Sequence, residues 1–154
     1  MEYEFLLKEA ASENIYIIEN ASFQSEADAL INGNIIGINK NIRDKRNRTC
    51  ILAEELGHYH TTVGNILNLS KTINRKQELQ ARLWAYDRLI GLNGIIRAYK
   101  EGCQDLYEMA EYLEVTENFL KNALDAYKSK YGENVEYEDY LITFIPILDV
   151  KPID

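Results

Sequence analysis

The chain has 154 residues, 46% of them hydrophobic, which is enough for one packed domain or a core domain with a small appendage and excludes wholesale disorder. Its 25 acidic and 17 basic residues give a net charge of −8, which argues against a general nucleic-acid-binding protein, because such proteins gain affinity by neutralising phosphates. No apolar run reaches the roughly 18 residues of a membrane span, and the acidic N-terminus lacks the features of a signal peptide. We therefore expect a cytoplasmic protein without a membrane partner.

Hydrophobic periodicity predicts a short N-terminal helix followed by a small sheet. The helix is expected over residues 2–12, and residues 15–18 form a short β-type run. An Asn-Gly-Asn sequence then separates two apolar runs at 29–31 and 35–38, which predicts a tight hairpin.

The rest of the chain is predicted to be mostly helical, since its only two prolines lie near the C-terminus. The expected helices are 44–63, ended by Gly64, then 75–90, 94–100, 104–113 and 116–131, with a terminal strand or tail over 140–145. The fold class is α+β: a small antiparallel sheet or hairpin packed on a helical core, followed by a C-terminal helical segment. We expect a core over residues 1–100 and a C-terminal extension over residues 101–154 that packs on it.

One stretch of the 44–63 helix combines residues suited to metal chemistry. Glu54 and His58 are four residues apart and fall on one side of the helix, with Glu55 between this pair and the apolar stripe. Two ligands one turn apart beside a carboxylate is the geometry by which His-Glu-x-x-His binds zinc and positions a general base. The motif here reads Glu-Glu-x-x-His, a spacing that also fits an ordinary surface Glu–His pair.

A catalytic zinc site needs a third protein ligand, and the next helix offers one. Glu78 shares a helix face with Ala81 and Ala85, whose small side chains would let this helix approach the first one closely.

Three polar residues on the first helix are further candidates for the site. Thr61 and Asn65 lie on the face of the Glu54–His58 pair and could hydrogen-bond to the ligands. His60 lies about 160° around the helix from His58, so it could replace a ligand only if the helix breaks there.

The order and spacing of these segments resemble the ImmA/IrrE family of metallopeptidases over roughly residues 10–130. The resemblance rests on Ile35-Ile36-Gly37-Ile38-Asn39, Leu52-Ala53-Glu54-Glu55-Leu56-Gly57-His58 and Glu78-x-x-Ala81-x-x-Trp84-Ala85. It implies a zincin-like helical core in which Glu55 is the catalytic residue. Glu54, His58 and Glu78 would then hold the metal, with Glu54 standing where the family has its first His.

A Glu at the first ligand position changes the chemistry expected of the metal. Two carboxylates and one imidazole are more anionic than two imidazoles and one carboxylate, so a bound water is acidified less. The expected ion is Zn²⁺, with Mn²⁺ or another hard divalent ion as the alternative, or no metal at all if the site is degenerate.

The resemblance also implies a substrate class. Family members act against repressors of prophages, mobile elements or DNA-damage responses, so we expect an endopeptidase that cleaves a helix–turn–helix repressor. The alternative is a catalytically degenerate family member that binds a repressor or another protein without cleaving it. An extended substrate segment is expected to add to the edge of the hairpin near residues 35–38.

Residues 105–127 combine the apolar spacing of a helix–turn–helix skeleton with an acidic surface. Six acidic residues against one lysine give this segment a net charge of −5. Phosphate would repel a recognition helix of that charge, so we expect structural packing here and no stable DNA binding.

Overall fold

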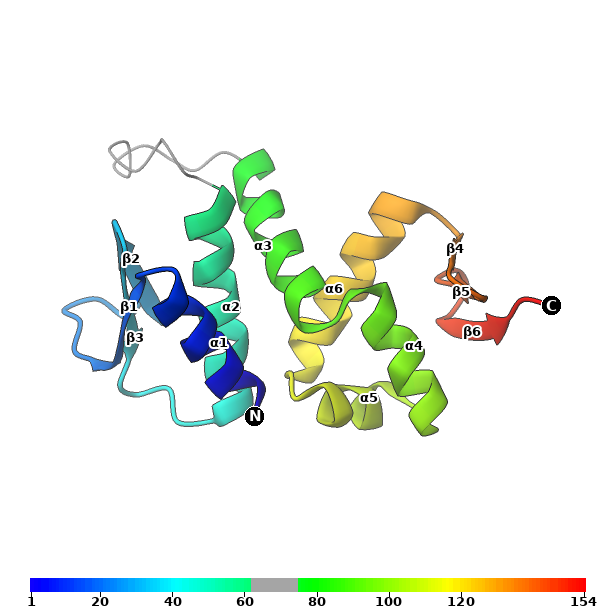
Figure 1. The fold of residues 1–154 in the computed structure, drawn as a ribbon, viewed down its shortest axis with the longest axis horizontal. Helices are drawn as coiled ribbons and strands as arrows, with labels where there is room; N and C mark the ends of the chain where they lie inside the picture. Colours follow the sequence, from blue (N-terminus) through cyan, green and yellow to red (C-terminus); the bar gives the residue numbers. More distant parts are fainter. Residues whose placement is uncertain (62–74) are drawn as a thin grey trace. The chain divides into compact units, whose positions relative to one another are not determined.

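The computed structural model describes residues 1–61 and 75–154, which form two compact units, Met1–Arg88 and Leu89–Asp154 (Figure 1). Each unit combines helices with a three-stranded sheet, which confirms the α+β class. The division into domains at residue 100 stays a prediction, since compactness divides the chain at Arg88. Among the described helices, none is both long and apolar enough to cross a membrane.

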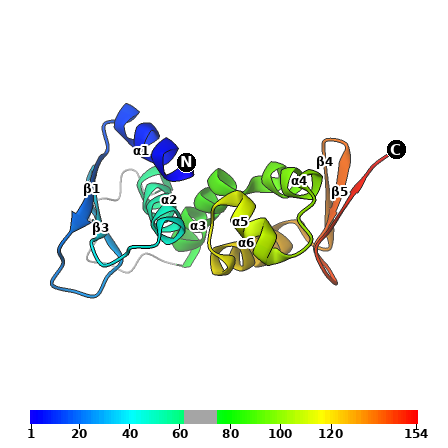
Figure 2. The ribbon, with the colours of Figure 1, turned by 90° about the horizontal axis from the view of Figure 1, so that it is seen from below.

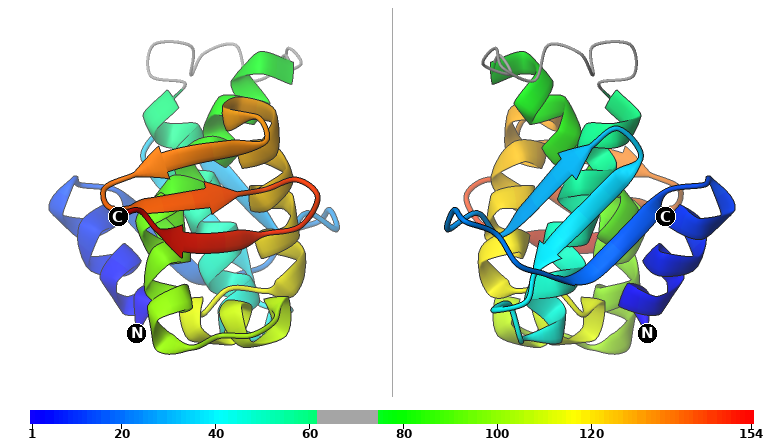
Figure 3. Two further views of the ribbon diagram at one scale, coloured as in Figure 1. Left: turned by 90° about the vertical axis from the view of Figure 1, so that its right-hand side faces the viewer. Right: turned by 90° about the vertical axis from the view of Figure 1, so that its left-hand side faces the viewer.

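The N-terminal sheet contains β1 (Tyr16–Ala21), β2 (Ala29–Asn32) and β3 (Ile35–Asn39), in the order β1-β3-β2 (Figure 3, right). β2 and β3 form the predicted hairpin, with Gly33 in the turn at a φ of 61°, which glycine adopts without steric cost. β1 pairs with β3 in parallel, a pairing that the antiparallel prediction did not include. Because β3 is hydrogen-bonded on both sides, the predicted docking edge near residues 35–38 is wrong.

Two helices, α1 (Glu2–Ser12) and α2 (Lys45–Thr61), pack with this sheet, and α3 (Arg75–Leu89) packs against α2. Their bounds lie close to the predicted ranges, although the predicted stop of the long helix at Gly64 lies outside the described residues. Asp44 fixes the start of α2, because its side chain accepts a hydrogen bond of 3.0 Å from the backbone N–H of Asn47.

The core of the N-terminal unit lies where α1, α2 and one face of the sheet meet. Its buried side chains include Leu6, Ala10, Ile15, Ile36, Ile38, Leu52, Ala53 and Leu56. Arg48 adds polar contacts at the start of α2: it donates to the carbonyl of Ile42 at 2.8 Å, to the hydroxyl of Tyr3 at 3.2 Å and to the carbonyl of Glu19. The helix that carries the motif is therefore held at its first turn by both α1 and β1.

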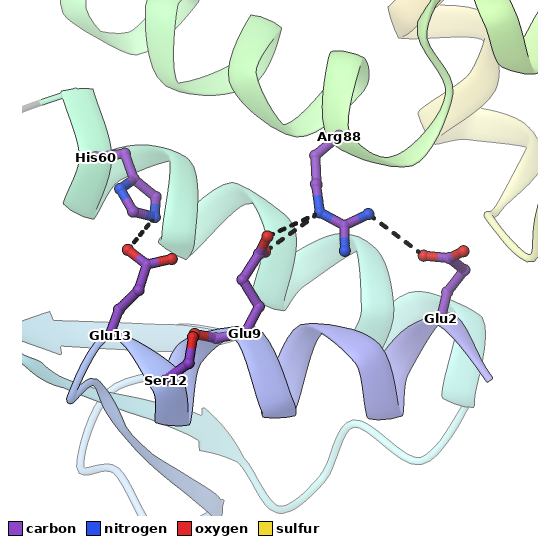
Figure 4. A network of polar contacts seen from close by, with 6 residues as sticks. All are labelled: Glu2, Glu9, Ser12, Glu13, His60 and Arg88. Carbon is purple, nitrogen blue, oxygen red and sulfur yellow. Dashed lines mark hydrogen bonds and ion pairs between the residues drawn. The ribbon is translucent and has the colours of Figure 1, made fainter.

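Glutamates on α1 and at its C-terminal end reach α2 and α3 (Figure 4). Arg88 Nε donates to Glu9 Oε2 at 3.2 Å, and Arg88 Nη1 lies 3.6 Å from Glu2 Oε2. His60 Nε2 lies 3.2 Å from Glu13 Oε2. Such partly exposed pairs each contribute less than about 1 kcal/mol, so their role is to align α1 with the other two helices.

The C-terminal unit places three helices beside a second sheet (Figure 2; Figure 3, left). Its elements are α4 (Gly91–Glu101), α5 (Leu106–Leu113), α6 (Glu117–Tyr131), β4 (Asn134–Tyr137), β5 (Tyr140–Thr143) and β6 (Asp149–Pro152). The predicted terminal strand over 140–145 corresponds to β5, which is the central strand of an antiparallel sheet. The flanking strands β4 and β6 were not predicted.

α5 and α6 are joined by a short turn, and the helix–turn–helix skeleton expected for them stays a prediction. Asp105 caps α5 by accepting a bond of 2.8 Å from the N–H of Glu108, and Thr116 caps α6 by accepting one of 3.1 Å from the N–H of Phe119. Glu114 ends α5 in the left-handed conformation, with a φ of 60°. Val115, in the turn, is fully buried, so the turn packs into the core of the unit.

Candidate active site

α2 and α3 approach each other closely at Gly57. A Cβ atom added to Gly57 would lie 3.1 Å from the carbonyl carbon of Ala81 and closer still to its oxygen. The side chains of Ala81 and Ala85 are fully buried, as expected for a helix face that packs tightly. The close approach brings the next residue of α2, His58, within reach of the first turn of α3.

His58 and Glu78 meet across this interface. His58 Nε2 lies 3.5 Å from Glu78 Oε2, and only 15% of the His58 side chain is exposed. The other carboxylate oxygen of Glu78 accepts a hydrogen bond of 3.1 Å from Arg82 Nε, one turn along α3. Arg82 therefore holds Glu78 so that one oxygen remains directed to the imidazole.

The two adjacent glutamates of α2 lie in the same electrostatic environment. Burial raises the pKa of Glu55 to about 7, and the negative charges of Glu54 and Glu78 add to the increase. Burial also raises the pKa of Glu54; the Arg82 guanidinium opposes this increase, while Glu78 and Asp28 add to it. The site therefore concentrates negative charge in a partly dehydrated place, which favours either protons or a cation.

The other sequence candidates have different partners. His60 pairs with Glu13, the residue that follows α1, and stacks on Trp84, with ring centroids 4.9 Å apart. Thr61 donates a bond of 2.7 Å to the carbonyl of Gly57, the residue four positions earlier, so its hydroxyl serves its own helix. Asn65 lies outside the described residues.

The site geometry described above lies in a chain that is similar to a known protein family. The family model for the IrrE N-terminal-like domain, a metallopeptidase family, matches residues 8–125. The chain belongs to this family. No curated protein and no solved structure matches the chain. The predicted resemblance to ImmA/IrrE proteins is confirmed, and this IrrE-like family implies a peptidase that acts on protein.

The residues of this IrrE-like chain fit a divalent cation by their chemistry. Oxygen ligands from glutamate and a nitrogen ligand from histidine are donors that such ions accept, and a cation would relieve the charge that raises the pKa values of Glu54 and Glu55. In residues 1–61 and 75–154, no group of three or more His, Cys, Asp or Glu side chains is arranged to hold a metal ion. The structure brings His58 and Glu78 together. A complete set that includes Glu54 stays a prediction.

Three residues that shape the IrrE-like site, Gly57, Arg82 and Asp28, were not predicted from the sequence. A glycine inside a helix costs stability relative to alanine, so Gly57 within the motif was a signal of close packing. Arg82 stands four residues after Glu78, the spacing of a helical ion pair. Asp28 had no such signal, since only the fold brings the residue before β2 near α2.

Proposed function

We propose that the chain is a metal-dependent endopeptidase of the ImmA/IrrE type that cleaves a helix–turn–helix repressor of a prophage or mobile element. The observation that carries this proposal is the meeting of His58 and Glu78, 3.5 Å apart, beside the paired glutamates of α2. Family membership supports peptidase chemistry, and the resemblance to ImmA/IrrE proteins supports the repressor as substrate.

Glu55 is the proposed general base. A pKa of about 7 leaves its carboxyl group partly ionised at neutral pH, so it can accept a proton from the attacking water and return it to the leaving amine. Glu54, His58 and Glu78 would hold a divalent ion, with Zn²⁺ proposed first and Mn²⁺ as the alternative. Such an ion would supply Lewis-acid polarisation of the scissile carbonyl.

The substrate is proposed to bind as an extended strand along β2. β2 lies at an edge of the sheet, in contact with α2, whereas β3 is central. Edge strands offer unpaired backbone groups to an incoming segment, and a strand bound there would run beside the helix that carries Glu55.

The decisive experiment compares the natural protein with Glu55→Gln in a lysate of the host cell, by mass spectrometry of newly formed protein N-termini. Glutamine keeps the size of the side chain but cannot accept the proton, so general-base loss should slow cleavage by about 10²–10⁴-fold. We expect new N-termini in a DNA-binding repressor with the natural protein only. Circular dichroism and metal analysis should show the same fold and the same metal content for both proteins.

The second candidate function is a binding protein with a degenerate site. Two features favour it: by the resemblance, Glu54 stands where the family has its first His, and the described residues contain no complete metal-binding group. This reading predicts that the purified protein contains no stoichiometric metal and yields no new N-termini, yet retains a repressor on an affinity column. Glu55→Gln would then retain the repressor equally well.

A further inference from the structure

A groove of about 830 Å³ lies entirely within the C-terminal unit. It is lined by the end of α4, the start of α5, the middle of α6 and the link between β5 and β6. Its floor is apolar: Met109, Phe144 and Val150 line it and are only 4–6% exposed. Ile147, on its wall, is 73% exposed, although an isoleucine gains free energy by leaving water.

The net negative charge of this unit favours a positively charged partner. The segment Leu89–Asp154 contains thirteen acidic and six basic side chains, so it holds −7 of the chain's net −8. Three aspartates, Asp105, Asp125 and Asp149, line the groove. Two lysines, Lys121 and Lys128, line it as well.

The two lysines do not reverse the sign of this surface. Lys121 and Lys128 stand four and three residues from Asp125 on α6, the spacings at which helical side chains of opposite charge neighbour each other. The lining itself carries three aspartates against two lysines, so the net negative field comes from the excess of acidic residues in the whole unit, and this field attracts cations.

We propose that this groove binds a basic amphipathic segment of a partner protein. The apolar side chains of the segment would cover Met109, Phe144, Val150 and Ile147, and its lysines or arginines would face the three aspartates of the lining. An amphipathic helix in an apolar groove is a common mode of protein recognition, and complementary charge adds specificity and a faster association. The proposal goes beyond the peptidase function, because it needs neither a metal nor cleavage.

Charge disfavours two other occupants. Nucleic acid would be repelled by a unit of net charge −7. A second copy of the same unit would meet its own negative field, since both partners would bring the same excess of acid.

The test uses the full chain and a fluorescein-labelled helical peptide with leucines at helical spacing and lysines elsewhere. A second peptide with glutamate in place of every lysine is the control for apolar binding alone. By fluorescence anisotropy, the lysine peptide should bind at least about tenfold more tightly than the glutamate peptide, and added salt should reduce this difference. Amide chemical shifts should change at Met109 and Val150.

Two variants distinguish binding in the groove from an effect of the overall charge of the unit. Ile147→Lys and Tyr112→Lys each add one positive charge at an exposed apolar residue of the same unit, but only Ile147 lines the groove. Ile147→Lys should lower the affinity for the lysine peptide about tenfold, whereas Tyr112→Lys should change this affinity about twofold or less. Both proteins should keep the circular dichroism spectrum of the natural chain.

Several results would overturn the proposal. Equal affinity of the natural chain for the two peptides would show that the groove does not select a basic segment. An equal loss of affinity for the lysine peptide in the two variants would show the same. If anilinonaphthalene sulfonate fills the groove and the lysine peptide does not displace it, the groove is a small-molecule site. A dimer that Ile147→Lys abolishes would assign the groove to a second copy. Glu55→Gln should bind the lysine peptide normally, so failure of the peptidase proposal would leave this test unaffected.

Discussion

Glu54 and Glu55 show how a single pair of neighbouring residues sets the chemistry of α2. Both carboxyl groups have a raised pKa, and burial is the largest cause for each. A protein gains nothing in stability from such dehydrated negative charge, so the arrangement is typical of a site that takes up a proton or a cation. The effect of each residue can be measured separately.

For the metal-free protein, we predict that Glu55→Gln changes the pH dependence of stability. The pKa of Glu55 is higher in the folded state than its ordinary value, so the stability that its proton supplies is complete below about pH 4.5 and is lost as the pH rises through about 7. Glutamine cannot ionise, so near pH 8 the free energy of unfolding of the variant should exceed that of the natural protein by up to about 3 kcal/mol. Near pH 4 this difference should disappear. Urea unfolding in the presence of a chelator measures this difference.

The matched control is Glu133→Gln, which removes one negative charge from an exposed position in the other unit. It should leave the dependence of unfolding free energy on pH as it is in the natural protein. A Glu55→Gln variant that follows the same pH curve as the natural protein would contradict the proposed environment of Glu55.

We predict that Glu54→His increases the affinity for Zn²⁺. The change creates a His-Glu-x-x-His motif and replaces the anionic oxygen of a proposed ligand with an imidazole, the more usual partner of zinc beside another histidine and a glutamate. Competition with a chromogenic chelator should show zinc binding at least about tenfold tighter than in the natural protein. Glu54→Gln is the control, since it removes the charge without providing a good ligand, and it should bind less zinc than either protein.

Among the secondary-structure elements, the packing between α2 and α3 determines how closely the residues of the candidate site approach each other. Sequence periodicity placed Glu78, Ala81 and Ala85 on one face, and the structure confirms that this face meets α2. The same periodicity could not give the distance between the helices, which depends on the missing side chain of Gly57. Spacing thus predicted which residues meet, and the glycine determines how closely.

Gly57→Ala should separate the two helices. The added Cβ would collide with the backbone of Ala81, which cannot turn away as a side chain could, so the variant should lose about 1–3 kcal/mol of stability. The His58–Glu78 contact should weaken in parallel, lowering metal affinity. Thermal unfolding and metal titration measure the two effects.

Gly94→Ala in α4 is the matched control for this change. Its nearest contact would be the Leu113 side chain at 3.4 Å, an ordinary van der Waals distance. The variant should be neutral or gain roughly 0.5–1 kcal/mol, as alanine does over glycine inside a helix. Equal stability of Gly57→Ala and Gly94→Ala would contradict the close approach of α2 and α3.

Strands proved harder to predict than helices, for a physical reason. A helix depends mainly on local sequence, such as the capping residues Asp105 and Thr116, and all the described helices were predicted from local sequence. A strand depends on partners that are distant in sequence: β1 needs β3, and β4 and β6 need β5. The short β4 and β6 have little local signal, and the parallel pairing of β1 has none.

At the scale of the whole molecule, charge divides the chain into two unequal parts. The N-terminal unit, with the candidate site, has twelve acidic and eleven basic residues, whereas the C-terminal unit has thirteen and six. The predicted helix–turn–helix skeleton lies in the acidic unit, so the surface charge of that unit opposes the usual ligand of the motif. The fold alone would suggest DNA binding, and the charge argues against it.

We predict that the chain does not bind duplex DNA at physiological salt. Non-specific binding rests on phosphate neutralisation and typically gives dissociation constants of about 10⁻⁴–10⁻⁶ M. An acidic unit of net charge −7 should therefore have a dissociation constant for duplex DNA above about 10⁻⁴ M. The charge explanation is checked by Glu111→Lys, Glu117→Lys and Asp125→Lys combined, which reverses three exposed acids on α5 and α6. This variant should acquire weak DNA binding that disappears as salt increases. Sub-micromolar binding by the natural chain would show that the helix–turn–helix skeleton contacts DNA despite its charge, and would overturn the view of this unit as a protein-binding scaffold.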